Sequence, residues 1–509
     1  MSFFESLLAL LLAAVLLLQV ARRLRLPYPA MLAGAGVLVA MIPGAPQIAI
    51  DPTTALALFI APVLLDAAFD YPLGAARSLI VPLLVYAVVA VLVTAFGVAV
   101  LGWWLIGLPF AAALTLGAIV APPDAAAATA VLSNLPIARR VDAVLKGESL
   151  FNDATALLLF NAALLVQERG GLDWWTGSQI AIAVPGGIAF GIFYGIVVRR
   201  VTDGMGNSVG GTLLQFVNAF LTWVIAEHLH LSAVLATVSS AMTIAALSHG
   251  GGSPRMRVHS YAVWTTVVFL LNVLAFLLMG LQASRIVGAM TGAALTQAAW
   301  FSAAVVATVI VVRLAIAFAY RLYNRLRGTR AAITRAESLL VGWTGMRGLI
   351  TLATAFALPP GFPQRDTVVL AAFTVVLATL VIQGATLAPL IHLFGIGRED
   401  EARREIEEAR AALAQAALDR LDGEHGGDAE ELRAIYRAVS RRAEDETARQ
   451  FLDRRHALSL TAVMAQRERL ESLRAEQRIS SEAYLQLQED LDWKHLSVLG
   501  DEDRRIAEA

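Results

Sequence analysis

Residues 108–132 read Leu108-Pro-Phe-Ala-Ala-Ala-Leu-Thr-Leu-Gly-Ala-Ile-Val120-Ala-Pro-Pro-Asp124-Ala-Ala-Ala-Ala-Thr-Ala-Val-Leu132. The stretch is apolar enough to cross a bilayer, for which about 20 helical residues are needed. The two prolines lack N–H donors, so the helix should break before Asp124 and leave carbonyls free. Membrane transporters coordinate ions at such breaks. The stretch therefore predicts an all-α membrane transporter; the alternative is a proline kink beside an Asp124 that is hydrogen-bonded to another helix.

The composition agrees with a membrane protein. Of the 509 residues, 57% are hydrophobic and 16% charged, unlike a soluble domain. The net charge of −1 predicts no attraction to nucleic acid. The chain has no cysteine, so disulfides and thiolate metal sites are excluded, and nothing in the sequence calls for a cofactor.

Apolar runs continue along most of the chain. We predict about thirteen transmembrane helices, although twelve or fourteen also fit the pattern. The predicted spans are Phe3–Val20, Tyr28–Ile42, Thr53–Phe69, Leu79–Ile106, Leu108–Leu132, Ala143–Val166, Ile180–Val198, Thr212–Ala226, Leu231–Leu247, Tyr261–Leu281, Ala294–Tyr320, Glu337–Leu358 and Val368–Leu393.

The connections between these spans predict an orientation. Loops after odd-numbered spans, counted with Lys146 in the first turn of the sixth span, carry sixteen Lys and Arg residues, whereas loops after even-numbered spans carry three. Basic residues concentrate in cytoplasmic loops. We therefore expect a multi-pass protein of the cell membrane, the inner membrane in a bacterium, with the N-terminus outside and the C-terminus in the cytoplasm, in contact with membrane lipid.

The composition changes near residue 397. Beyond it, charged residues alternate with Ala and Leu, as in Glu401-Ala-Arg-Arg-Glu-Ile-Glu-Glu-Ala-Arg410. This pattern predicts a soluble helical segment. The expected organisation is a transmembrane domain at residues 1–396 and a cytoplasmic helical domain at residues 397–509.

Ionisable residues inside the predicted spans are few. They cost several kcal/mol unless paired or hydrated, so each is a candidate for function. They are Asp66, Asp124, Glu148, Asp153, Arg313 and Arg347. The four carboxylates outnumber the two guanidiniums, which favours a cationic substrate.

The sixth predicted span contains Gly147-Glu148-Ser149-Leu150-Phe151-Asn152-Asp153. At helical spacing, Glu148 and Asn152 share one face, and Ser149 and Asp153 share an adjacent one. A carboxylate in a partly dehydrated cavity holds a proton more tightly, so a monovalent cation and a proton can compete for its oxygens. The spacing therefore predicts cation/proton exchange, with Ser149 and Asn152 completing an oxygen-rich site.

Two arginines lie inside predicted spans, and each guanidinium needs either an anionic partner or a position from which it reaches water. Arg347 lies within Gly342-Trp-Thr-Gly-Met-Arg347-Gly348, and we predict that it pairs with Glu148 and leaves Asp153 as the titrating group. For Arg313 the sequence favours a position near a span end, with its guanidinium reaching out of the membrane.

At these residues the chain resembles the monovalent cation/proton antiporter family, which includes NhaP-type bacterial sodium/proton antiporters and animal sodium/proton exchangers. The resemblance rests on residues 147–153, Thr344-Gly-Met-Arg-Gly348 and Gln383-Gly-Ala-Thr386. It implies a thirteen-helix inverted-repeat fold with broken crossing helices, and a homodimer in which a six-helix bundle moves against a dimerisation domain.

The resemblance also implies a site. It would contain Asp153, Asp124, Ser149, a carbonyl near Pro123 and Asp66, with Glu148 and Arg347 as a structural ion pair. The Asn152-Asp153 pair implies electroneutral exchange of one cation for one proton. This chain has Pro123-Asp124-Ala125 where the family has Thr-Asp-Pro, and Asp66 where Glu is common, so Na⁺, K⁺ and Li⁺ all remain candidates.

Two other classes fit the buried acids less well. A cation channel would conduct ions without proton coupling. An intramembrane aspartyl protease would need two carboxylates, such as Asp124 and Asp153, to share a proton. Such a protease gives no reason for Ser149 and Asn152 at their positions.

Overall fold

The structure is a computed structural model of the 509-residue chain. It describes residues 12, 14–17, 19–20, 28–40, 52–71, 79–124, 139–171, 174–202, 208–248, 254–328, 334–394 and 399–498. Within these ranges every regular element is a helix. The chain forms two compact units, residues 1–397 and 398–508.

The helices of the first unit follow the predicted spans closely, apart from the first span, which falls mostly outside the described residues. They are α2 Tyr28–Ala40, α3 Pro52–Asp70, α5 Ile80–Leu84, the π-helix η1 Val85–Val89, α6 Ala90–Ile106, α7 Phe110–Val120, α9 Arg139–Arg169, α10 Trp174–Thr202, α11 Val209–His228, α12 Ala233–Leu247, α13 Pro254–Ala289, α14 Gly292–Leu326, α15 Arg335–Trp343, α16 Leu349–Phe356 and α17 Arg365–Phe394.

Length and composition mark several of these helices as membrane-spanning. Among the described residues, six helices are long and apolar enough to cross a bilayer. They are residues 80–106, 141–169, 177–202, 254–289, 292–326 and 365–394. The other apolar helices are shorter, and two predicted spans are interrupted: the fifth after α7 and the twelfth between α15 and α16. The described residues therefore form a multi-pass helical fold with broken helices.

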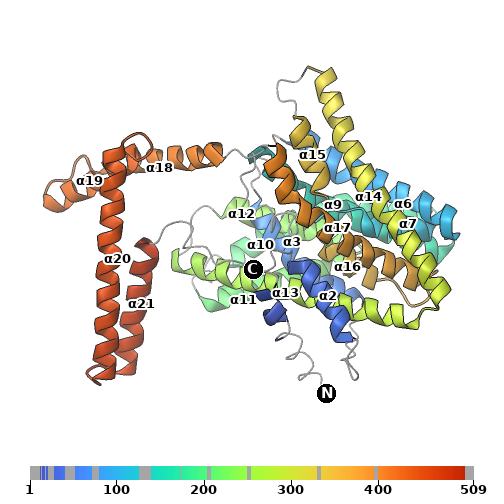
Figure 1. Ribbon diagram of the computed structural model, residues 1–509, viewed down its shortest axis with the longest axis horizontal. Helices are drawn as coiled ribbons and strands as arrows, with labels where there is room; N and C mark the ends of the chain where they lie inside the picture. The colour runs from blue at the N-terminus through green and yellow to red at the C-terminus, as the bar shows by residue number, and fades with distance from the viewer. Residues whose placement is uncertain are drawn as a thin grey trace. The chain divides into compact units, whose positions relative to one another are not determined.

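Packing divides this unit into two bundles. The core bundle contains α6, α7, α9 and α14 to α17, and the scaffold bundle contains α2, α3 and α10 to α13. Figure 1 shows the two groups on opposite sides of the unit. Helix α3 of the scaffold bundle packs against α9 and α16 of the core bundle. The boundary between the bundles therefore runs beside the broken helix α15–α16.

Small residues set the closest helix contacts. Along α10, Gly187, Gly191 and Gly195 recur every four residues and face backbone atoms of α12. A Cβ at Gly187 would lie 2.8 Å from the Ser232 carbonyl oxygen, and one at Gly195 would lie 2.9 Å from that of Ser240. Small residues at this spacing let membrane helices approach backbone to backbone.

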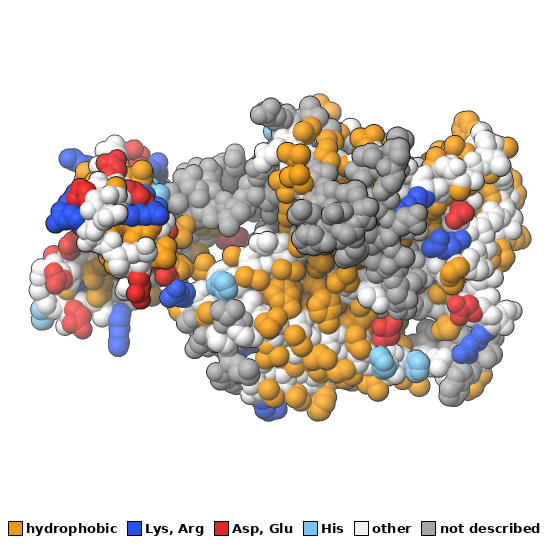
Figure 2. All heavy atoms as spheres, turned by 90° about the horizontal axis from the view of Figure 1, so that it is seen from below, with side chains coloured by type: hydrophobic (Ala, Val, Ile, Leu, Met, Phe, Trp, Pro, Cys, Tyr) orange, Lys and Arg blue, Asp and Glu red, His pale blue; other side chains and the backbone are white. Residues whose placement is uncertain are grey.

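The outer surface of the first unit is apolar. In Figure 2, orange is the commonest side-chain colour on the described part of this unit, whereas red and blue side chains are denser on the second unit. Trp103 is 58% exposed and Trp104 is 77% exposed at the end of α6. An apolar surface with exposed tryptophans at a helix end is typical of contact with lipid.

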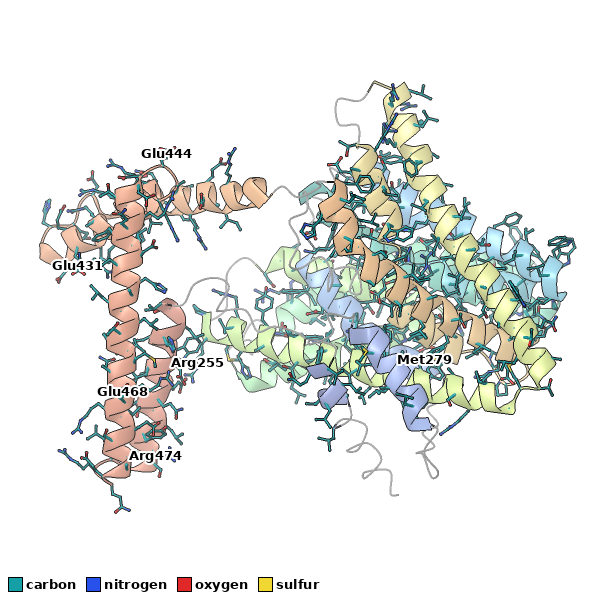
Figure 3. All side chains as sticks on the ribbon, in the orientation of Figure 1. Arg255, Met279, Glu431, Glu444, Glu468 and Arg474 are labelled. Atoms are coloured by element: carbon teal, nitrogen blue, oxygen red, sulfur yellow. The ribbon has the colours of Figure 1, made fainter. Side chains whose placement is uncertain are left out.

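The second unit consists of four helices with a charged surface: α18 Glu399–Leu421, α19 Gly427–Arg441, α20 Glu446–Ala475 and α21 Ser481–Val498. Helices α20 and α21 pack side by side around a small cluster of Leu470, Tyr484 and Leu491. The Arg474 guanidinium lies 4.3 Å from the centre of the Tyr484 ring. Glu431, Glu444, Glu468 and Arg474 project from this unit in Figure 3.

Candidate functional site

The site begins at the break in α7. This helix ends at Val120, and residues 121–124 are not helical, as the two prolines predict. Arg347 supplies donors to the end of α7: its Nε donates to the Val120 carbonyl at 3.0 Å and its Nη2 to the Ala121 carbonyl at 3.3 Å. A cation at this end also complements the negative pole of the helix.

A second break lies opposite the first, between α15 and α16. Asp124 crosses to it: its backbone N–H donates to the Met346 carbonyl at 2.7 Å, and its Oδ2 accepts from the Leu349 N–H at 3.2 Å. The carboxylate therefore lies at the positive end of α16. Each broken helix is capped by a charged side chain from the other. The backbone N–H of Arg347 also donates to the Thr379 hydroxyl at 3.0 Å.

Helix α9 joins the first break through Asn152. Its Nδ2 donates to the Pro123 carbonyl at 2.9 Å, while its Oδ1 is enclosed and has no partner among the described residues. The residue is fully buried. The carbonyl that the family resemblance implies in the site is therefore in contact with a predicted site residue.

The predicted ion pair between Glu148 and Arg347 is wrong. Glu148 pairs instead with Arg313 of α14, through Nη1 to Oε1 and through Nη2 to Oε2, the latter at 3.0 Å. Arg347 donates to backbone carbonyls, including that of Gly345. It can do so because the two broken helices leave carbonyls without helical partners.

The expectation for Arg313 is also wrong. Its side chain is 3% exposed and does not reach out of the membrane. Helix α14 extends to Leu326, beyond the predicted end of the span. Thirteen residues separate Arg313 from that end, about 20 Å at the helical rise. A guanidinium this far inside needs an internal anion, and Glu148 provides it.

Asp153 is the buried acid that remains. It is 6% exposed, and within the described part of the chain it has no hydrogen-bond or ion-pair partner. The charged groups nearest in electrostatic effect are the carboxylates of Asp124 and Glu148. Glu148 is paired with Arg313 and Asp124 caps α16, so Asp153 differs from both in having no partner among the described residues.

Ser149 and Asp66 are the two remaining predicted site residues with polar side chains. Ser149 is half-buried, one turn before Asp153 on α9. Asp66 is half-buried on α3, the scaffold helix that packs against α9 and α16. Among the residues that the structure describes, no three His, Asp or Glu side chains converge as a metal site. A cation here would rely on hydroxyl and carbonyl oxygens as well as carboxylates.

Sequence reasoning missed two residues of this neighbourhood. Thr379, whose hydroxyl holds the Arg347 N–H, lies one turn before the Gln383-Gly-Ala-Thr386 segment. Tyr86 lies in η1 with an enclosed hydroxyl, and its ring centroid is 5.6 Å from that of Tyr320. A buried Thr and a buried Tyr carry no charge, so only their polarity inside apolar spans could have drawn attention to them.

A helical membrane protein with two interrupted helices that cap each other beside an unpaired buried acid is a secondary cation transporter and not an enzyme. The model of one protein family, described as sodium/hydrogen exchanger, transmembrane, matches residues 8–393. The chain belongs to this sodium/hydrogen exchanger family, as its sequence resemblance predicts.

Individual relatives agree. NhaH, a Na⁺/H⁺ antiporter of Halobacillus dabanensis, is 30% identical over 355 residues, which are 67% of this chain and 83% of the relative. A sodium, potassium, lithium and rubidium/H⁺ antiporter of Bacillus pumilus is 26% identical over 496 residues, 91% of this chain and 73% of the relative. The solved sodium proton antiporter MjNhaP1 of Methanocaldococcus jannaschii matches with a TM-score of 0.58 at 17% identity, over 76% of this chain and 100% of that one. This last likeness concerns the fold.

Proposed function

We propose that this chain exchanges Na⁺ for H⁺ across the cell membrane by alternating access, with one cation and one proton competing for Asp153. The observation that carries the proposal is the isolation of this acid: it is buried, and it has no partner among the described residues. When the carboxylate binds a proton it loses the charge that attracts the cation. Binding of one ion therefore excludes the other, which is the condition for coupled exchange.

The charges around Asp153 support a stoichiometry of one for one. Glu148 has its own cation in Arg313, and Arg347 and Asp124 each cap a helix end. We assign the change of charge during the cycle to Asp153 alone. Exchange of one Na⁺ for one H⁺ at such a site moves no net charge, so it is electroneutral.

The ligands of the cation are proposed to be Asp153, Asp124, Ser149, Asp66 and the Pro123 carbonyl. Asn152 uses one lone pair of that carbonyl, and a carbonyl oxygen has two. K⁺ and Li⁺ are alternative substrates, since the Bacillus pumilus relative is named as an antiporter of both. We also propose a homodimer with the N-terminus outside and the second unit in the cytoplasm, on the basis of the basic loops and the family resemblance.

Flux in sealed proteoliposomes tests this proposal. Imposed proton gradients should drive Na⁺ uptake, with and without an imposed voltage, and an electroneutral exchanger should respond to the proton gradient alone. Asp153→Asn should abolish exchange and leave a folded protein, because the amide cannot bind or release a proton. Asp366→Asn, which removes an exposed carboxylate on α17, is the matched control.

Three outcomes would contradict the assignment. Proton-coupled exchange at the parental rate in Asp153→Asn would exclude this residue as the shared site. A rate that changes with voltage would exclude the one-for-one stoichiometry. Conductive Na⁺ flux without proton movement would favour a channel.

A further inference from the structure

A polar stripe runs along α9 from its first turn to the buried acid. Asp142, Lys146, Ser149 and Asp153 are separated by four, three and four residues. These are the spacings of a single helix face, because an α-helix turns once every 3.6 residues. The functions proposed above use the two inner members of the stripe and leave the two outer members, Asp142 and Lys146, without a role.

Exposure falls from Lys146 inward to Asp153. The side chains of Lys146 and Asp142 are 52% and 37% exposed, Ser149 is half-buried, and Asp153 is 6% exposed. Lys146 and Asp153 are seven residues apart, about 10 Å along the helix axis. Lys146 therefore lies about one Debye length from the buried acid at ordinary ionic strength. Asp142 lies one turn farther out, about 16 Å from that acid along the helix axis.

The two outer residues form an ion pair that opens easily. Lys146 Nζ lies 2.9 Å from Asp142 Oδ2, and both side chains meet solvent, where such pairs are weak. Lys146 is one of only two lysines in the chain, the other being Lys494. An ammonium on a flexible stem makes a compact contact with a carboxylate, unlike the rigid two-point contact of arginine. Asp142 can therefore be released toward an arriving cation.

We propose that Asp142 and Lys146 form the entrance of the cation path to Asp153, on the membrane side where α9 begins. Asp142 attracts the hydrated cation to the stripe, and Lys146 limits this attraction by neutralising Asp142. Removing Asp142 should therefore hinder cation entry, and removing Lys146 should favour it. A purely structural ion pair would not give opposite effects for its two members. This inference rests on the proposed exchange at Asp153 and adds where the cation enters.

Exchange kinetics give the first test. In vesicles with Na⁺ supplied from the α9-start side, Lys146→Gln should lower the KM for Na⁺ by about threefold to tenfold, and Asp142→Asn should raise it by a similar factor. Lys146→Arg keeps the charge and should shift KM less than Lys146→Gln. Both effects should shrink in high choline chloride, where screening shortens the Debye length to a few ångströms. Arg325→Gln, an exposed cation on α14, is the control.

Chemical labelling gives a test that needs no transport. Because the chain has no cysteine, Ser149→Cys places a single thiol on the stripe between the entrance and Asp153. Its modification by cationic and by anionic methanethiosulfonate reagents of similar size reports the local potential. Adding Lys146→Gln should raise the ratio of the cationic to the anionic rate by about threefold or more, and adding Asp142→Asn should lower it.

The two tests separate failures of the two proposals. Equal rate ratios in all three backgrounds, or KM shifts of the same sign in Lys146→Gln and Asp142→Asn, would overturn the entrance. A thiol at position 149 that neither reagent reaches would overturn it as well. Rate ratios that shift as expected, together with no Na⁺/H⁺ exchange by the parental protein that keeps Ser149, would support the entrance and contradict the proposed function.

Discussion

Glu148 and Arg313 show how individual residues stabilise a charged interior. Both are almost fully buried, and two hydrogen bonds join them. Removing one member of such a pair leaves the other charge buried without compensation, which costs about 3–5 kcal/mol. The pair therefore stabilises the core bundle and fixes α9 against α14, and the transported ions need not touch it.

Thermal unfolding of the detergent-solubilised protein can measure this contribution. We expect Arg313→Ala to destabilise by about 3–5 kcal/mol. Lys146→Ala breaks an exposed pair on the same helix as Glu148 and should cost less than about 1 kcal/mol. The double variant Glu148→Ala with Arg313→Ala should be less destabilised than the sum of the single variants. Additive losses would show that the two side chains do not stabilise each other.

Sequence reasoning identified the buried charged residues but not all of their partners. Each of Asp124, Glu148, Asp153, Arg313 and Arg347 stands out because it interrupts an apolar span. Pairing depends on which side chains face each other across helices that lie far apart in the chain. Residues 148 and 313 are separated by 165 positions, and no periodicity carries that information.

At the scale of elements, the two broken helices form one unit through their reciprocal caps. Gly348 allows the closest part of this contact. A Cβ at this position would lie 2.8 Å from the Cβ of Asp124 and closer still to its carboxylate. Only a residue without a side chain leaves Asp124 room to bind the first N–H of α16.

Gly348→Ala should therefore displace Asp124 and reduce exchange at least about tenfold while the protein still folds, a loss of the size expected when a binding group is misplaced by about 1 Å. Flux in proteoliposomes measures the loss, and the melting temperature reports folding. Gly361→Ala is a matched control, because nothing lies within 4 Å of a Cβ there. Normal exchange in Gly348→Ala would mean that the Asp124 cap is not needed for transport.

The elements themselves were largely predictable. From the second span on, the described part of each predicted span coincides with a helix or with an interrupted helix, and α7 ends at Val120, just before the two prolines. Residues 125–132 of the fifth span lie outside the described residues. The second break, at residues 344–348, contains no proline and was not predicted. Its glycines permit the break, but the capping by Asp124 that stabilises it comes from tertiary contact.

For the whole molecule, the described residues form two units of opposite surface character. The first is apolar outside and carries the candidate site, and the second is highly charged with a small cluster of its own. The sequence contributes to this contrast through composition, which is apolar before about residue 396 and charged after it. The arrangement of the first unit into two bundles depends on which helix faces meet, and the apolar pattern of the spans does not specify it.

Truncation after residue 396 should leave a protein that folds, dimerises and exchanges Na⁺ for H⁺ at a rate within about threefold of the full chain, because each unit has its own buried cluster. Light scattering in detergent measures the mass of the assembly, and vesicle flux measures the rate. Loss of assembly with intact folding would assign the dimer contact to the second unit. Loss of flux with intact assembly would instead indicate that the second unit is needed for transport.

The reciprocal caps also restrict how such proteins can be recombined. Arg347 closes a helix that ends more than two hundred positions earlier, and Asp124 closes one that starts more than two hundred positions later. A chimera that takes residues 110–124 from one homologue and 335–356 from another would combine two segments whose capping contacts come from different proteins. Libraries built from related genes should therefore exchange these two segments together.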